Sequence, residues 1–140
     1  MMKTKTLDLT LIRYLNLFEK ITKVRTDSCF IYNNILFFAV PRGFVYRAVG
    51  EQGRNIKELS QIIGKRIKVI EKPEGDSDSG KFILDIISPV QPKNIDISTK
   101  EVVITAGKLN YNALIGRDKQ KFKELQKIIE EYLGKELKIV

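Results

Sequence analysis

Apolar and polar positions along the first half of the chain predict the element order helix, strand, strand, helix, helix and strand. A helix is predicted over 7–21, where apolar residues recur at helical spacing after Thr6 as the N-cap. Two segments rich in β-branched and aromatic residues, 28–32 and 35–40, flank Asn33-Asn34, a pair that accepts the positive φ angles of a two-residue hairpin turn. The later elements of this half are predicted at 43–49, 54–63 and 66–70.

The second half of the chain repeats this order of elements. They are predicted at 81–87, 93–98, 101–106, 108–114, 120–133 and 136–140. Ile-Lys-Glu-Leu at 56–59 matches Phe-Lys-Glu-Leu at 122–125, and Gly50 and Gly116 each lie nine positions before the matched leucine. The segment 74–80 is polar and rich in Gly, Ser and Asp, which is typical of a linker. We therefore predict an α+β protein with two repeated domains, 1–73 and 81–140, joined by a linker at 74–80, each domain with a three-stranded sheet.

The charge of the chain is unevenly distributed. The formal net charge of the 140 residues is +8. Residues 41–72 carry eight Lys or Arg against three acids and residues 108–140 carry eight against five, whereas residues 73–107 carry three against six. Basic segments favour polyanionic partners, because each phosphate neutralised by Lys or Arg releases counterions.

The composition excludes several classes of chemistry. The chain has no His, so a Ser-His-Asp or Cys-His catalytic group is excluded, and its one cysteine, Cys29, cannot form an internal disulfide. No paired carboxylates or phosphate-binding loop of the nucleotide-binding type is visible, so we expect no enzymatic activity, cofactor or metal. Apolar runs are too short to cross a bilayer, and Lys3 and Lys5 interrupt any signal-peptide pattern. These features predict a cytoplasmic protein without membrane association.

A glycine-containing loop between two predicted helices is the main candidate for a binding site. Gly50-Glu51-Gln52-Gly53 leads into the helix at 54–63, whose N-terminal amides and dipole attract anions. Glycine also allows another backbone to approach closely. The structural alternative is a tight helix–helix turn, with the nearby lysines as ordinary solvated charges. The repeated framework of the chain favours the nucleic-acid interpretation.

The segment 49–56, Val-Gly-Glu-Gln-Gly-Arg-Asn-Ile, resembles the G-x-x-G signature of a KH domain. The element order resembles the type II, prokaryotic arrangement of that module, and two such units in tandem resemble the archaeal NusA-like proteins. The resemblance implies that each loop clamps the backbone of about four nucleotides of single-stranded RNA. It also implies a role in transcription termination or elongation, beside RNA polymerase and the nascent transcript, and we expect a monomer. The implied RNA contacts are Arg47, Gly50, Glu51, Gln52, Gly53, Arg54 and Lys57 in the first half and Gly116, Arg117, Asp118, Lys119 and Lys121 in the second, with Ala48, Val49 and Ile67 lining an apolar groove for bases.

The chain departs from the family pattern at two positions. Glu51 places an acid where a phosphate is expected, and Lys119 replaces the second glycine of the second loop, where its Cβ hinders close backbone approach. We therefore expect the first loop to be the better clamp and the second to contribute through charge. Two alternatives stay open: a KH-fold scaffold that binds RNA polymerase or ribosomal proteins with little RNA affinity, and a binder of single-stranded DNA.

Overall fold

The computed structural model describes residues 8–140, and the chain divides into two compact units, one ending at Lys72 and the other beginning at Pro73. We call them unit 1 and unit 2 and describe each by itself. No helix of the described residues is long and apolar enough to span a bilayer. The predicted N-cap, Thr6, lies outside the described residues.

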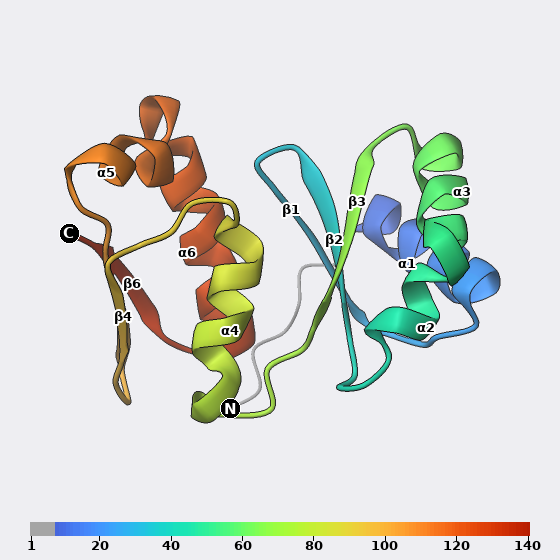
Figure 1. The fold of residues 1–140 in the computed structure, drawn as a ribbon, viewed down its shortest axis with the longest axis horizontal. Coiled ribbons are helices and arrows are strands. Elements are labelled where there is room, and N and C mark those ends of the chain that lie inside the picture. Colours follow the sequence, from blue (N-terminus) through green and yellow to red (C-terminus); the bar gives the residue numbers. More distant parts are fainter. Residues whose placement is uncertain (1–7) are drawn as a thin grey trace. The chain divides into compact units, whose positions relative to one another are not determined.

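Unit 1 has the predicted element order (Figure 1). Its elements are α1 (Leu9–Thr22), β1 (Ser28–Tyr32), β2 (Ile35–Val40), α2 (Val45–Val49), the short 3-10 turn η1 (Glu51–Gly53), α3 (Arg54–Ile63) and β3 (Arg66–Glu71). Strand β2 is central, antiparallel to β1 and parallel to β3. Asn33 and Asn34 form the β1–β2 turn with φ of 52° and 65°, as the sequence predicts. Asp8 is the N-cap of α1, and its carboxylate accepts hydrogen bonds from the amides of Thr10 and Leu11.

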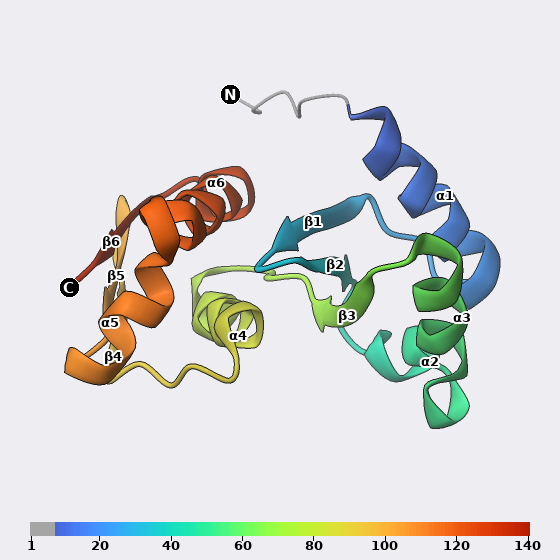
Figure 2. The same cartoon turned by 90° about the horizontal axis from the view of Figure 1, so that it is seen from above.

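The three helices of unit 1 cover one face of its sheet (Figure 2). Alternate residues of β2 face them, and Leu36, Phe38 and Val40 are fully buried with Phe18 of α1 and Leu59 of α3. The rings of Phe18 and Phe38 stack with centroids 4.2 Å apart. This core fixes the angle at which α2 and α3 meet, and the predicted binding loop lies between those helices.

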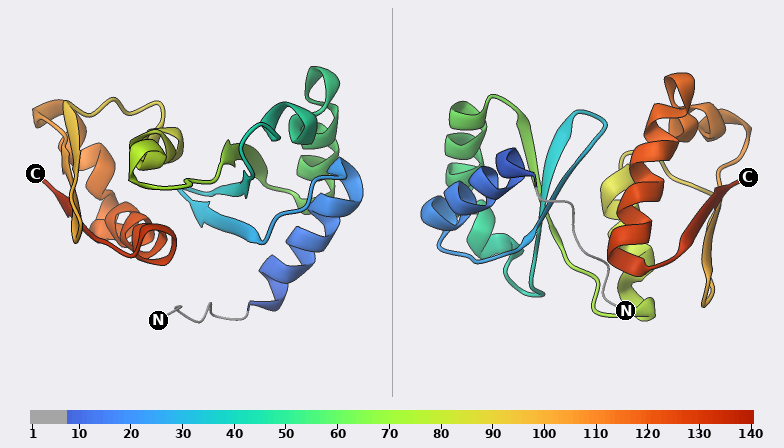
Figure 3. Two further views of the ribbon diagram at one scale, coloured as in Figure 1. Left: turned by 90° about the horizontal axis from the view of Figure 1, so that it is seen from below. Right: turned by 180° about the vertical axis from the view of Figure 1, so that it is seen from behind.

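Unit 2 repeats the arrangement, again with its helices on one face of a mixed sheet (Figures 1 and 3). Its elements are α4 (Asp76–Ile87), β4 (Asn94–Ile97), β5 (Glu101–Thr105), α5 (Lys108–Ile115), the 3-10 turn η2 (Arg117–Lys119), α6 (Gln120–Leu133) and β6 (Glu136–Ile139). Strand β5 is central, antiparallel to β4 and parallel to β6. The predicted α+β fold with two three-stranded sheets is therefore present in both halves.

The segment predicted as a linker, 74–80, is mostly helical. Helix α4 begins at Asp76, five residues before the predicted start, and Ser79 is buried. The Asp78 carboxylate accepts hydrogen bonds from the amides of Glu74 and Gly75, and the Ser79 hydroxyl donates to the Gly75 carbonyl at 2.8 Å. The polar residues that suggest a linker hydrogen-bond the backbone just before and at the start of a helix, which is the other common use of Asp and Ser.

Candidate nucleic-acid interface

The first loop is a tight reversal between α2 and α3. Gly50 has φ 83° and ψ 164°, a region that only glycine enters readily, and Gln52 and Gly53 are left-handed, with φ/ψ of 56°/26° and 74°/18°. The Gly50 amide donates to the Tyr46 carbonyl and the Gly53 amide to the Gly50 carbonyl, each at 3.0 Å. These bonds end α2 and start α3 within four residues, so the loop is held as one rigid turn.

The two glycines of this loop have different surroundings. A Cβ at Gly50 would lie 2.9 Å from Nδ2 of Asn55 and 3.1 Å from its backbone nitrogen. The side-chain amide of Asn55 in turn donates to the Ala48 carbonyl at 3.2 Å, which ties the start of α3 to the end of α2. A Cβ at Gly53 would meet only Cε of Lys57, at 3.9 Å. Gly50 is therefore required by packing inside the protein, whereas Gly53 leaves the outer side of the loop open.

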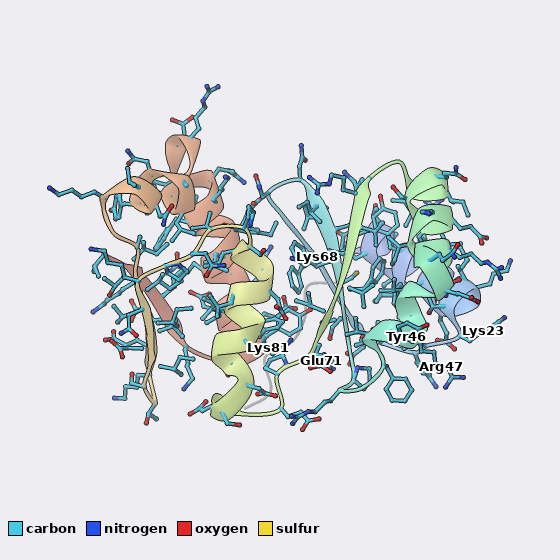
Figure 4. The ribbon with its side chains drawn as sticks, in the orientation of Figure 1. Lys23, Tyr46, Arg47, Lys68, Glu71 and Lys81 are labelled. Carbon is cyan, nitrogen blue, oxygen red and sulfur yellow. The ribbon has the colours of Figure 1, made fainter. Side chains whose placement is uncertain are left out.

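The outer side of the first loop carries almost no net charge. Glu51, Gln52, Arg54, Lys57, Glu58 and Gln61 line an open depression of about 550 Å³ beside it. The two acids of this set cancel the two bases. Arg47, exposed on α2, is the further predicted cation of this loop (Figure 4).

The second loop has the same backbone shape as the first. The φ/ψ angles are 78°/172° at Gly116, 54°/29° at Asp118 and 61°/24° at Lys119. The largest difference from the first loop is 13°, between φ of 74° at Gly53 and φ of 61° at Lys119. Matching hydrogen bonds hold it, from the Gly116 amide to the Asn112 carbonyl (2.9 Å) and from the Lys119 amide to the Gly116 carbonyl (3.2 Å). Lys119 thus adopts the left-handed conformation that glycine has in the first loop.

The second loop is more basic than the first. Arg117, Lys119 and Lys121 outnumber Asp118, a net of +2, and all three residues of η2 are exposed while Lys121 is half-buried. Lys121 occupies the place of Asn55, and a Cβ at Gly116 would lie 2.8 Å from its Cγ. The inner glycine is therefore required by packing in this loop as well, and the difference between the two loops is one of charge.

The predicted apolar groove is smaller than the sequence suggests. Ala48 has no exposed surface and belongs to the core of unit 1, so its side chain cannot line a groove. Val49 and Ile67 are half-buried and pack against that core, each with part of its surface open. Sequence reasoning also assigned no role to Asn55, although a polar residue two positions after G-x-x-G is a signal for a side chain that ties the loop.

The comparisons with known proteins place this architecture among archaeal relatives. No protein-family model matches the chain. The chain is 34% identical over 80 residues to a Methanocaldococcus jannaschii protein named "Probable transcription termination protein NusA", covering 57% of this chain and 42% of that protein. A protein of the same name from Halococcus morrhuae is 22% identical over 129 residues, covering 89% and 90%, and one from Methanococcus vannielii is 30% identical over 84 residues, covering 60% and 47%. The matches thus span less than half the length of two of these three relatives.

A solved structure supports the fold. The structure described as "Crystal structure of APE1850" superposes with a TM-score of 0.66 at 28% sequence identity, covering 96% of this chain and 100% of that chain. Both units here have the helix-strand-strand-helix-helix-strand order of type II KH domains. In sequence and in its tandem KH-type units, the chain is therefore NusA-like, similar to the archaeal proteins of that name.

Proposed function

We propose that this chain is a non-enzymatic, single-stranded RNA-binding protein that acts in transcription termination or elongation. The observation that carries the proposal is the loop that recurs with the same backbone angles before α3 and before α6. The printed name of the three relatives supports the setting in transcription. RNA polymerase or the nascent transcription complex is the partner that this setting implies.

In the proposed mechanism, the loops hold the phosphates of the RNA, and neighbouring side chains contact its bases. The dipole at the N-terminus of α3 and of α6 favours an anion beside the loop, where the first amide of each helix, that of Arg54 or Gln120, donates to the carbonyl of Glu51 or Arg117. Arg47, Arg54 and Lys57 supply positive charge at the first loop, and Arg117 and Lys119 supply it at the second. Such contacts position a strand without reading its sequence. The half-buried Val49 and Ile67 offer a small apolar surface for an unpaired base.

The proposal is tested by placing two aspartates in each loop of the full chain. Glu51→Asp with Gln52→Asp changes the first loop, and Arg117→Asp alone creates the same Asp-Asp pair in the second, since Asp118 is already present. Binding of a fluorescein-labelled oligouridine 12-mer is followed by anisotropy in about 0.1 M salt. On single strands the logarithm of affinity falls by about 0.7 per phosphate contact for each tenfold rise in salt. One contact therefore contributes about a fivefold higher affinity at 0.1 M salt than at 1 M salt. We expect each variant to lose at least that factor and their combination to abolish binding.

A matched control removes the effect of net charge. Lys100→Asp changes the charge by the same two units as Arg117→Asp but lies in the β4–β5 turn, at the opposite end of unit 2 from η2 (Figure 1). It is expected to change RNA affinity by less than a factor of two. Unchanged affinity in the loop variants, or an equal loss in Lys100→Asp, would reject the loops as the clamp. A circular dichroism spectrum matching that of the wild type shows that each variant is folded.

The charge balance at the first loop favours the scaffold alternative as a second candidate. Glu51 and Glu58 cancel Arg54 and Lys57 and leave Arg47 as the unbalanced cation, so this loop attracts a polyanion weakly. A scaffold is supported if the wild type binds no oligonucleotide yet retains polymerase or ribosomal proteins after nuclease treatment. Competition between RNA and DNA oligomers of the same sequence separates the third possibility, a preference for single-stranded DNA.

A further inference from the structure

An exposed tyrosine lies one helical turn before the first loop. Tyr46 of α2 has 78% of its surface exposed, and its carbonyl accepts the hydrogen bond from the Gly50 amide that ends the helix. Residues four apart share one face of a helix, about 6 Å apart along its axis. Within residues 8–140, no hydrogen bond or ring contact engages the Tyr46 side chain. Its ring is therefore open to a partner beside the loop.

Two exposed cations lie at the same edge of unit 1 as this ring. Arg47 is the next residue and is exposed, and Lys23, the exposed left-handed C-cap of α1, lies at the same edge of unit 1 (Figure 4). Two acids lie near as well: Glu51 is exposed in the adjoining loop, and Glu71 is half-buried and accepts a hydrogen bond from the Gly43 amide at 3.0 Å. A single exposed aromatic residue is common on protein surfaces. An open ring beside cations and beside a phosphate-binding loop has the composition of a stacking platform for single-stranded nucleic acid.

Unit 2 lacks both features at the equivalent positions. The carbonyl that accepts the Gly116 amide belongs to Asn112, so Asn112 corresponds to Tyr46, and Ala113 corresponds to Arg47. The second loop instead carries its cations within the loop, at Arg117 and Lys119. At these two positions unit 1 thus has an aromatic and a basic residue beside a neutral loop, whereas unit 2 has Asn112 and Ala113 beside a basic loop, with Lys108 and the 41% exposed Tyr111 elsewhere on α5.

We infer that Tyr46 and Arg47 form a base-stacking subsite that extends the first loop. An unpaired RNA base stacks on the Tyr46 ring, and the Arg47 guanidinium, aided by Lys23, contacts the phosphate that flanks it. The inference rests on the proposed function, because the strand reaches Tyr46 from the loop. It explains how a loop with little net charge binds RNA, since stacking on an aromatic ring does not depend on charge.

The inference is tested by separating base contacts from phosphate contacts in the full chain. Anisotropy compares Tyr46→Ala, Tyr46→Phe and the wild type on an oligouridine 12-mer and on an abasic RNA 12-mer with the same backbone. We expect Tyr46→Ala to weaken oligouridine binding about tenfold and abasic binding by less than a factor of two, and Tyr46→Phe to keep the wild-type affinity. Arg47→Gln is expected to lower the salt slope by about 0.7, whereas Tyr46→Ala leaves that slope unchanged.

A control residue and the contrary outcomes complete the design. Phe44→Ala removes an aromatic side chain that is 38% exposed at the N-cap of α2, at the end of the helix away from the loop, so it is expected to leave binding unchanged. Equal losses on both oligomers, an equal loss in Phe44→Ala, or no loss in Tyr46→Ala would overturn the subsite. If Arg117→Asp weakens binding but Tyr46→Ala does not, the subsite is wrong and the proposed function stands. If the wild type binds neither oligomer and Tyr46→Ala instead loses polymerase capture, both are wrong and the patch binds protein.

Discussion

The different surroundings of Gly50 and Gly53 predict different costs for one added methyl group. Gly50→Ala forces a side chain into φ 83° and ψ 164°, a region that costs about 1–3 kcal/mol outside glycine. Its Cβ would also displace Asn55, whose hydrogen bond to the Ala48 carbonyl contributes about 1 kcal/mol. We expect the free energy of unfolding of unit 1 to fall by about 3 kcal/mol in this variant.

Gly53→Ala and Gly64→Ala are the matched comparisons. Both residues are left-handed, with φ/ψ of 74°/18° and 79°/23°. A Cβ would meet only Lys57 Cε at 3.9 Å in the first case and nothing within 4 Å in the second. The left-handed conformation alone costs a non-glycine residue about 1 kcal/mol. Each of these variants is therefore expected to be destabilised by about 1 kcal/mol.

The chain contains its own probe for this comparison. Cys29 is the one cysteine, lies in β1 of unit 1 and is 8% exposed, so a thiol reagent reaches it when unit 1 opens. Labelling is measured at fixed pH over a series of sub-denaturing urea concentrations, where the urea-dependent part of the rate reports opening of the whole unit. Since 1.4 kcal/mol is tenfold in an equilibrium, Gly50→Ala should raise that rate about 150-fold and the two comparison variants about fivefold. Equal rates in Gly50→Ala and Gly53→Ala would refute the assignment of separate inner and outer roles to the two glycines.

Three further predictions concern individual side chains. Asn55→Ala removes the bond that ties α3 to α2 and should lower the stability of unit 1 by about 1 kcal/mol in the same labelling assay. Lys135→Met removes a buried ammonium that donates to the carbonyls of the β4–β5 turn at 2.5 and 3.0 Å, and should cost about 2 kcal/mol in urea unfolding followed by circular dichroism. Lys65→Met, at the matched but half-buried position of unit 1, should stay within about 0.5 kcal/mol, and a larger effect there would contradict the argument. Arg117→Gln should lower the slope of log affinity against log salt by about 0.7, and an unchanged slope would remove Arg117 from the phosphate contacts.

Elements whose ends carry special turn residues could be placed from the sequence. The predicted bounds of β1, β2, α3 and α6 match the structure, and each of these elements ends at or near a residue with positive φ. Gly64 and Gly134 are both left-handed C-caps, as glycines directly after a helical pattern usually are. Such residues are informative because few side chains accept their backbone angles, so the local sequence determines where the element ends.

The start of α4 could not be placed in the same way. Asp and Ser form linkers and also cap helices, because in both settings their side chains bind nearby backbone amides. The first large apolar residue of α4 is Phe82, so the preceding turn has no hydrophobic pattern that distinguishes the two uses. Ala48 presents a related difficulty, since α2 has five residues and too few positions to define its buried face. Tertiary packing decides where α4 begins and which side of α2 is buried, and the local sequence does not reveal that packing.

The substitution at Lys119 shows that loss of the second glycine need not change the shape of the loop. The outer position of the loop faces open space in unit 1, so the Lys119 side chain meets no obstacle that a glycine avoids, and the loop keeps its shape. Arg117, Lys119 and Lys121 then gather at the N-terminus of α6, where the helix dipole disfavours cations by about 0.3–1 kcal/mol each. A bound phosphate relieves that repulsion, so part of the electrostatic cost in the free protein becomes affinity for an anion. On this charge balance we expect unit 2 to hold a phosphate more strongly than unit 1, whereas the glycine content predicts the first loop as the better clamp.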